Sequence, residues 1–422
     1  MHIILFEDNQ VNHLYPITTG RAAFSVSIGS LRLLDLVEKL GGNIEPIVRP
    51  HLKKIVQELI PNSWSPEKGK RKGPLLIINA RTVPYAAMLP IWKEMLKFAE
   101  RGMILRSGNE VLAACIGEKE MSRLPNQEIG TAQLLGLLED IQLSTVEQKF
   151  DIDTIQAPSD VIRHHLLAID GNIEYRLTNG NYREIMDGVF VPDDDFPSPV
   201  IGEHFISNTK NGPILIEAGV NIGPFCYFHG PVHIGRKSKV IEHSAIKDKV
   251  AISKVCKIGG EVEASTVEPY TNKQHHGFLG HSYLGSWVNL GAGTCNSDLK
   301  NSYNEVSLET PYGRFPSGMQ FLGCVIGDYS KTAINTSIFT GKTIGSCSMV
   351  YGFVTTAVPS FVNYARSFGQ VTEIPAEVMI QTQSRMFARR NVEQKDADIQ
   401  LMRDMFELTR TERQLTSEPL SL

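Results

Sequence analysis

Aliphatic residues recur at every sixth position through the second half of the chain. The residues on this period are Ile216, Ile222, Phe228, Ile234, Val240, Ile246, Ile252, Ile258 and Ala264, then Phe278, Leu284 and Leu290, then Ile326, Thr332, Ile338, Ile344 and Val350. An amphipathic strand alternates with a period of about two residues and a helix with a period near 3.6, so neither explains this register. The period predicts a β-helix, in which each hexad is one short strand and one corner.

Two further features of the hexads favour a closed coil. A small or β-branched residue stands four places after most of the periodic aliphatics, as Val220 and Ser238 do, so a second side chain of each hexad can point inward. Glycine often follows the aliphatic, as at Gly223, where a tight corner leaves no room for a side chain. We expect three hexads per coil and a coil domain at residues 213–360, with irregular interruptions at residues 265–277 and 296–324.

The first 150 residues carry a different pattern, in which short apolar strands alternate with helical periods. We expect strands at residues 2–6, 75–80, 103–106 and 111–116, and helices at residues 31–40, 52–60 and 86–100. This alternation is typical of an α/β sheet domain, here residues 1–150. Residues 151–212 are predicted to be a connector, and residues 361–422 a helical tail.

Composition narrows the class of protein without identifying it. The 422 residues carry a formal net charge of -4 and 42% hydrophobic residues, which is ordinary for a soluble protein of two or three domains and gives no sign of nucleic-acid binding. The six cysteines form no CxxC pair, as expected of small core residues in a reducing compartment. No stretch approaches the roughly 20 apolar residues of a membrane span. We therefore expect a cytoplasmic protein that does not enter a membrane.

The densest group of histidines, His275, His276 and His281, lies in and just after the first interruption. Imidazole titrates near neutrality, so a histidine at a coil edge can take a proton from an amine or hydroxyl that attacks a thioester. His275 lies three places before the periodic Phe278, an outward phase. Two alternatives stay open: these histidines are ordinary polar loop residues, or His276 and His281 hold zinc, for which no third ligand is found at a matching place.

Several runs of this sequence resemble one family. They are GGEVEAS (259–265), NKQHHGFLG (272–280), SWVNLGAGT (286–294), NSDLKNSY (296–303), IGDYSKTAINTSIFTGKTIG (326–345), and, near the N-terminus, FEDNQ (6–10) and TTGRAAFSVSIGSLRLLD (18–35). They are similar to sugar nucleotidyltransferases related to the bifunctional N-acetylglucosamine-1-phosphate uridyltransferase and glucosamine-1-phosphate acetyltransferase. The resemblance implies a reduced nucleotidyltransferase-like α/β domain, a left-handed parallel β-helix of hexapeptide repeats, a homotrimer, and acetyl-CoA bound between coils of adjacent subunits.

The resemblance also implies roles for individual residues. His275 matches the catalytic base, Asn289 a contact of the sugar phosphate, and Ala292 a contact of acetyl-CoA. Further candidates are Gly293 beside the acetyl-CoA, and Lys273, Lys300 and Arg21 for a sugar phosphate or nucleotide sugar. The implied function is transfer of an acetyl or other acyl group from acetyl-CoA to an amino sugar or nucleotide sugar.

The chain departs from the family at positions that matter for both activities. Phe278 stands where the family has a substrate tyrosine, and Ile334 replaces a serine on the acyl-CoA side, so we expect an acceptor other than glucosamine-1-phosphate. The first strand is followed by residues 7–9 (EDN) without the glycines that cradle a triphosphate, and residues 79–84 (NARTVP) offer no aspartate for magnesium. Mg²⁺ is expected only if the N-terminal domain is active. The alternatives are a sugar-1-phosphate nucleotidyltransferase and a non-catalytic scaffold that binds sugar nucleotides.

Overall fold

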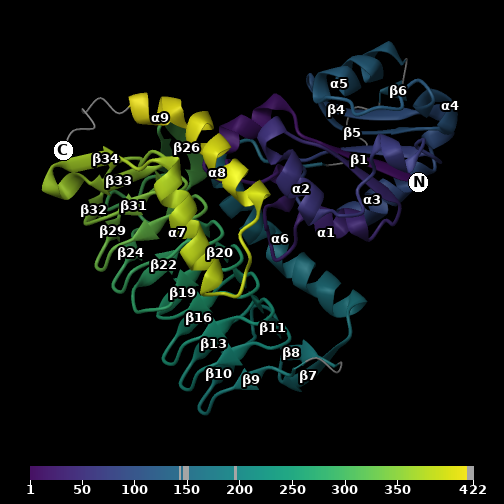
Figure 1. Ribbon diagram of the computed structural model, residues 1–422. Coiled ribbons are helices and arrows are strands. Elements are labelled where there is room, and N and C mark those ends of the chain that lie inside the picture. Colours follow the sequence, from purple (N-terminus) through teal and green to yellow (C-terminus); the bar gives the residue numbers. More distant parts are fainter. Residues whose placement is uncertain (142–143, 146–151, 194–196, 416–422) are drawn as a thin grey trace. The chain divides into compact units, whose positions relative to one another are not determined.

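The computed structural model describes residues 1–141, 144–145, 152–193 and 197–415 (Figure 1). The chain divides into two compact units. Unit 1 comprises Met1–His13, Arg21–Val26 and Leu31–Gln156, and unit 2 comprises Leu14–Gly20, Ser27–Ser30 and Ala157–Leu422. The expected boundary at residue 150 lies outside the described residues, and two short N-terminal segments belong to unit 2 instead of to the first domain.

Unit 1 is an α/β domain built on a six-stranded sheet of order β2-β1-β3-β5-β4-β6. Its strands are β1 (His2–Phe6), β2 (Asn43–Ile47), β3 (Leu75–Asn79), β4 (Met103–Ser107), β5 (Glu110–Ile116) and β6 (Ser144–Thr145). Its helices are α1 (Leu33–Glu38), α2 (Lys53–Leu59), α3 (Met88–Leu96), α4 (Glu118–Met121) and α5 (Thr131–Asp140). The central β1 and β3 are buried along their whole length, as their continuous apolar runs predict. Sequence patterns missed β2 because Glu45 and Pro46 interrupt its apolar run.

Unit 2 contains a parallel β-helix whose short strands stack on three faces (Figure 1). The first face consists of β8 (Val189–Pro192), β11 (Ile214–Ile216), β14 (Val232–Ile234), β17 (Val250–Ile252), β20 (Thr266–Val267), β23 (Tyr283–Leu284), β27 (Cys324–Ile326) and β30 (Lys342–Ile344). The second consists of β9 (Val200–Ile201), β12 (Asn221–Ile222), β15 (Lys239–Val240), β18 (Lys257–Ile258), β21 (Asn272–Lys273), β28 (Lys331–Thr332), β31 (Met349–Val350) and β33 (Val362–Ala365). The third consists of β10 (Ile206–Asn208), β13 (Tyr227–His229), β16 (Ala245–Lys247), β19 (Glu261–Glu263), β22 (Phe278–Gly280), β24 (Cys295–Asn296), β29 (Ser337–Ile338) and β32 (Phe353–Val354).

The periodic aliphatics form the interior of this coil. Ile216 pairs with Ile234, and Ile234 pairs with Ile252, one full coil further along the chain. Val220 and Cys226, on the second inward position of the hexad, are buried in the same cluster. The β-helix is therefore confirmed as predicted from the period of six, while its left-handed winding stays a prediction from the resemblance.

The coil begins earlier than the sequence period indicates. Strands β8, β9 and β10 pair in parallel with β11, β12 and β13, so the first coil starts at Val189, inside the predicted connector 151–212. The inward Val191 and the half-buried Ile201 do not keep the six-residue spacing, which hid this coil. The same segment also contains the long helix α6 (Pro158–Asn179) and strand β7 (Tyr182–Met186).

The first expected interruption is a shortened coil and not a break. Strands β20 and β21 lie within residues 265–277 and continue the first and second faces. The shortening shifts the inward phase, because Val262 and Leu279 enter the core where the period predicts Ala264 and Phe278. Phe278 is only half-buried, so the periodic assignment of these two positions is wrong by one or two residues.

The second interruption and the tail add elements to the end of the coil. Residues 296–324 form an antiparallel hairpin of β25 (Val306–Thr310) and β26 (Gly313–Met319), and β25 continues the first face beside β30. The tail contains a further antiparallel strand, β34 (Gln370–Glu373), before the predicted helices, which are α7 (Ala376–Ala388), α8 (Asp396–Leu408) and α9 (Arg410–Leu415). The last expected tail residues, 416–422, lie outside the described residues.

One corner of the coil anchors the tail helices. The corner residues Trp287, Cys347 and Phe361 have left-handed φ angles of 61°, 63° and 58°. Their side chains contact the tail: Trp287 lies 4.5 Å from the Phe387 ring of α7, and Phe361 lies 5.3 Å from the Phe406 ring of α8. This packing brings the end of α7 against the second face of the coil.

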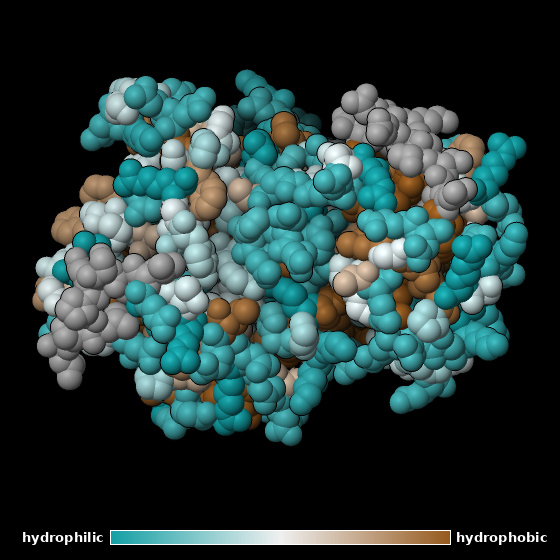
Figure 2. Space-filling view, turned by 90° about the horizontal axis from the view of Figure 1, so that it is seen from above, coloured by the Kyte–Doolittle hydropathy of each residue, from teal (hydrophilic) through white to brown (hydrophobic). Residues whose placement is uncertain are grey.

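The face of the molecule seen in Figure 2 is mostly hydrophilic, with small groups of hydrophobic residues between the polar ones. Among the described residues, no helix combines the length and the apolar character that crossing a membrane requires.

The phase shift can be tested by a pair of substitutions. Leu279→Ala removes a fully packed side chain from the coil interior and should lower the free energy of unfolding by about 2–5 kcal/mol. Phe278→Ala, its neighbour on β22, should cost clearly less because the ring is only half-buried. Urea unfolding followed by circular dichroism measures both. A larger loss of stability for Phe278→Ala would show that Phe278, and not Leu279, is the inward residue.

Candidate functional site

A groove of about 630 Å³ lies in unit 2 on the second face of the coil. Its walls come from four successive coils and from the end of α7. The lining residues are Lys257, Tyr270, Asn272, Gln274, His275, Trp287, Asn289, Leu290, Gly291, Ala292, Lys331, Ile334, Met386, Arg389 and Arg390. Three residues that the sequence singles out, His275, Asn289 and Ala292, are therefore brought together in one groove.

The floor of the groove is a column of polar residues in register. Lys257 pairs with Asn272, Asn272 bridges to Asn289, and Asn289 bridges to Lys331. Each stands directly before an inward residue of the second face, so the alternation of the strand turns it outward. The amide of Asn272 donates to Oδ1 of Asn289 at 3.2 Å, which holds the two central amides against each other.

Aromatic rings form one wall. Tyr270 and Trp287 occupy successive left-handed corners, and their rings stack 4.4 Å apart with an interplanar angle of 2°. Phe387 covers the other side of Trp287, so the indole is held between two rings. The opposite rim carries Ile334, which is 69% exposed. This rim offers an apolar contact next to the polar floor.

The groove collects positive charge without a compensating carboxylate. Lys257, Lys331, Arg389 and Arg390 line it, and no aspartate or glutamate does so among the described residues. Burial and then repulsion by Arg390 lower the pKa of Lys257, and burial lowers the pKa of Lys331 to about 8. Burial likewise lowers the pKa of Arg390, and Arg389 lowers it further. Cations that are pressed together in this way favour an anionic ligand.

His275 lies at the edge of this charged groove. Its side chain is exposed, and its imidazole makes no hydrogen bond to the described residues. The period predicts that the His275 side chain points outward, and its exposure agrees with this. The inward residue of the following strand is Leu279, however, and not Phe278, from which the phase was counted. A histidine in this position can exchange a proton with a ligand in the groove.

Lys273 has a structural place in the coil instead of the substrate contact that the sequence suggests. Its side chain is 2% exposed and points into the interior, where burial lowers its pKa to about 8. The ammonium donates to the carbonyl oxygens of Gly259 at 2.6 Å, His275 at 3.0 Å and Gly277 at 2.7 Å. It therefore fixes the loop that carries His275 from inside.

Three other candidates are not among the described residues that line the groove. Gly293 is a corner residue with a φ of 76°, where an added Cβ would lie 2.1 Å from Oδ1 of Asn335. Lys300 belongs to the insertion after β24, and its ammonium donates to the carbonyl of Glu305 at 2.6 Å. Arg21 belongs to unit 1, where its carbonyl accepts a hydrogen bond from Arg49.

Sequence reasoning did not bring the four cations together in one groove, and only two of them carried a positional signal. Lys257 and Lys331 directly precede periodic positions, so the phase of the coil places them outward on the same face as Asn289. Arg389 and Arg390 lie in the predicted helical tail, and its sequence alone does not place them at the groove. Their approach depends on the packing of Phe387 against Trp287, a contact between residues far apart in the chain.

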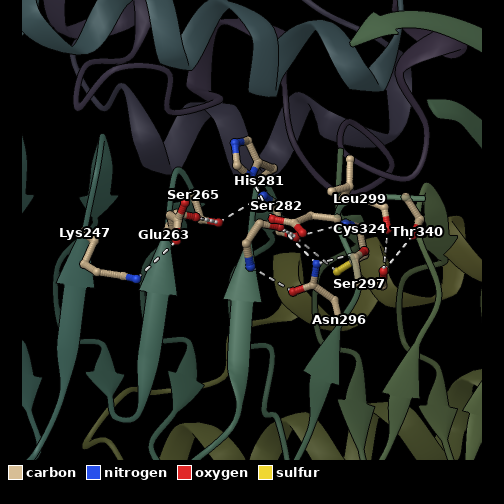
Figure 3. A network of polar contacts seen from close by, with 12 residues as sticks. Lys247, Glu263, Ser265, His281, Ser282, Asn296, Ser297, Leu299, Cys324 and Thr340 are labelled. Atoms are coloured by element: carbon tan, nitrogen blue, oxygen red, sulfur yellow. Dashed lines mark hydrogen bonds and ion pairs between the residues drawn. The ribbon is translucent and has the colours of Figure 1, made fainter. Parts of the chain in front are cut away.

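His281 belongs to a separate polar network at another corner of the coil (Figure 3). Its Nδ1 lies 2.8 Å from Oδ2 of Asp298, and its ring stacks on Phe321 at 5.2 Å. Asn296 pairs with the backbone of Gly280 through both its amide atoms, at 2.9 and 3.0 Å. Within the described ranges, no cluster of three or more His, Cys, Asp or Glu side chains offers a metal site, so the zinc alternative gains no support.

Comparison with known proteins adds relationships to this geometry. Residues 3–180 match the family model described as sugar nucleotidyl transferase. The chain is 32% identical over 142 residues to a bifunctional sugar-1-phosphate nucleotidylyltransferase/acetyltransferase from Sulfurisphaera tokodaii, which covers 33% of this chain and 35% of that protein. It is 36% identical over 114 residues to the bifunctional protein GlmU of Synechococcus elongatus, covering 26% of this chain and 22% of that protein. The chain thus spans about a third or less of the length of these relatives.

Solved structures resemble the chain only loosely. A UDP-N-acetylglucosamine acyltransferase from Francisella novicida has a TM-score of 0.25 and 15% sequence identity, covering 53% of this chain and 80% of that one.

The role assigned to Lys273 can be tested by removing its charge. Lys273→Met keeps most of the side-chain volume but removes the ammonium that donates to three carbonyl groups, of which the one of Gly259 is buried, so it should lower the free energy of unfolding by about 1–3 kcal/mol. Lys257→Met, on the groove floor, is the matched control and should change stability much less. Urea unfolding of both variants measures the difference. Equal, small effects would show that the ammonium does not hold the loop.

Proposed function

We propose that the β-helix of this chain is an acyltransferase. The proposal rests on the match of residues 3–180 to the sugar nucleotidyl transferase family and on the distant similarity to bifunctional nucleotidylyltransferase/acetyltransferases. The reaction is transfer of an acetyl or other acyl group from acetyl-CoA to an amino sugar or a nucleotide sugar. The observation that carries the proposal is the groove in which His275 and Asn289 face four cations without a carboxylate.

The charges of the groove suit the donor. Coenzyme A carries several phosphates, and Lys257, Arg389 and Arg390 supply cations that no carboxylate lining the groove neutralises. Arginine presents a planar set of donors that matches two phosphate oxygens at once. The exposed Ile334 and the half-buried Met386 offer apolar contacts for the uncharged stem of the donor.

The acceptor reacts beside His275. In the proposed reaction, the imidazole takes the proton from the acceptor amine or hydroxyl as the oxygen or nitrogen attacks the thioester carbonyl, and coenzyme A leaves as the thiol. Asn289, which is exposed on the groove floor, is placed to hydrogen-bond the acceptor sugar. Because Phe278 replaces a substrate tyrosine of the family, the proposed acceptor is other than glucosamine-1-phosphate.

We propose that the working form is a homotrimer. Large apolar side chains are exposed on the last coils of the β-helix, which favours contact with another copy of the chain. They are Ile334 at 69%, Phe339 at 49%, Phe353 at 58% and Phe368 at 71% exposure. A neighbouring subunit that covers these residues would also enclose the rim of the groove at Ile334.

The base assignment is tested by thiol release from acetyl-CoA with a panel of amino sugars and nucleotide sugars. His275→Ala should reduce kcat about 10²–10⁴-fold, because the imidazole moves the proton in the rate-determining step. His276→Ala is the matched control, since this exposed neighbour does not line the groove among the described residues, and it should keep most of the activity. Unchanged turnover in His275→Ala would remove the assignment.

The donor site is tested with two arginines at the C-terminal end of α7. Arg389→Ala should raise KM for acetyl-CoA about tenfold with little change in kcat, because it removes a phosphate contact distant from the thioester. Arg385→Ala, an exposed arginine of α7 outside the groove lining, should behave like the unaltered protein. Equal effects of the two substitutions would show that the groove cations do not bind the donor.

A further inference from the structure

Unit 1 contains a second pocket, of about 530 Å³, at the carboxyl ends of β1 and β2 and at the start of α5. In an open α/β sheet this edge is where ligands bind. Polar side chains without charge lie around it, namely Asn9, Asn12, Gln57, Ser63, Ser65 and Thr131. Nothing in the proposed acyl transfer uses this pocket.

Four carboxylates line the pocket, and three of them, Glu7, Asp8 and Glu45, are each paired with an arginine. Glu7 accepts from the Arg49 guanidinium at 3.0 and 3.1 Å and from two backbone amides. Asp8 accepts from Arg81 at 2.9 and 2.8 Å, and Glu45 accepts from Arg71 at 2.7 and 2.6 Å. Both oxygens of each of these three carboxylates are therefore engaged within the protein.

This pairing does not fit the magnesium ion that nucleotidyl transfer implies. Mg²⁺ binds through open carboxylate oxygens in a near-octahedral arrangement and gives up its waters reluctantly. Here a guanidinium stands at each of the three buried or half-buried carboxylates, and the cost of breaking such a pair is several kcal/mol. The remaining carboxylate, Glu128, is exposed and paired with Lys53 at 3.0 Å.

The loop after β1 does not fit a triphosphate either. A phosphate cradle needs backbone amides that point at the ligand. The amide of Glu7 donates to the carbonyl of Ile47, that of Gln10 to Oδ1 of Asp8, and that of Val11 to the carbonyl of Asp8. The loop closes on itself in a 3₁₀ helix, Asn9–Leu14, where a glycine loop would open toward phosphates.

We propose that the pocket of unit 1 binds an uncharged, hydroxyl-rich ligand, a neutral sugar or a nucleoside, without metal and without a polyphosphate. The wall charges cancel in pairs, so an added anion or cation gains little. Amide side chains such as Gln57 and Asn9 both donate and accept, which matches the hydroxyl groups of a sugar or ribose ring. The hydroxyl of Thr131 donates to the carbonyl of Glu7 at 2.6 Å and can still accept a hydrogen bond. The pocket thus keeps the place of a nucleotide site but has the chemistry of a sugar-binding site.

Isothermal titration of the full-length protein with uridine, N-acetylglucosamine and UTP tests this. At least one of the two neutral compounds should bind, with the same affinity in EDTA and in Mg²⁺, and UTP with Mg²⁺ should bind no tighter than uridine. Which of the neutral compounds binds tells whether the sugar or the nucleoside is the recognised part. Gln57→Ala should weaken the binding about tenfold, through loss of one or two hydrogen bonds to the ligand.

Asn126→Ala is the matched control, because this exposed amide of unit 1 does not line the pocket among the described residues. It should bind the neutral compound like the unaltered protein. Three results would overturn the proposal: binding of neither neutral compound, binding that Gln57→Ala leaves unchanged, or binding of UTP that is tighter than that of uridine and requires Mg²⁺. Acyltransferase activity is measured separately and does not enter these outcomes.

Discussion

The inward packing of the periodic side chain of each hexad is the constraint on which the rest of unit 2 depends. Ile258, Lys273, Leu290 and Thr332 take the inward places of successive coils on the second face. Because side chains of a strand alternate, the residue before each of them must face outward, in register with its neighbours. The groove floor is a direct consequence of this packing. The inward Lys273 is tolerated only because three carbonyl oxygens accept hydrogen bonds from its ammonium group.

The sequence predicts this arrangement well where the coil is regular and poorly where its length changes. Periodicity identified the β-helix and most of its core, but the shortened coil moved Leu279 inward and Phe278 outward, since a shift by one residue changes the face of a strand. His275 was found from its outward phase within the group of histidines as well as from the resemblance to a family, and Asn289 and Ala292 from the resemblance alone. Sequence alone could not place Arg389 and Arg390 at the groove, because their position depends on the distant contact of Phe387 with Trp287.

The charged side chains around the two pockets are arranged differently. In the β-helix groove, no carboxylate from the described part of the chain lines the wall beside the cations, which favours an anionic donor. In the pocket of unit 1, Glu7, Asp8 and Glu45 each form an ion pair with an arginine. The sheet and the position of the pocket are nevertheless those of a nucleotidyltransferase-like domain. The match of residues 3–180 to the sugar nucleotidyl transferase model therefore concerns the scaffold, while the side chains of the pocket decide which ligand it can take.

Hydrogen–deuterium exchange of the full chain with and without coenzyme A tests the central claim most directly, because a ligand of the groove must touch coil and tail together. The account predicts simultaneous protection of residues 272–276, 287–292 and 386–390, with unchanged exchange in the early coils at residues 214–240. Protection confined to unit 1, or no protection of the tail residues when the coil segments are protected, would contradict a single groove formed by the second face and α7.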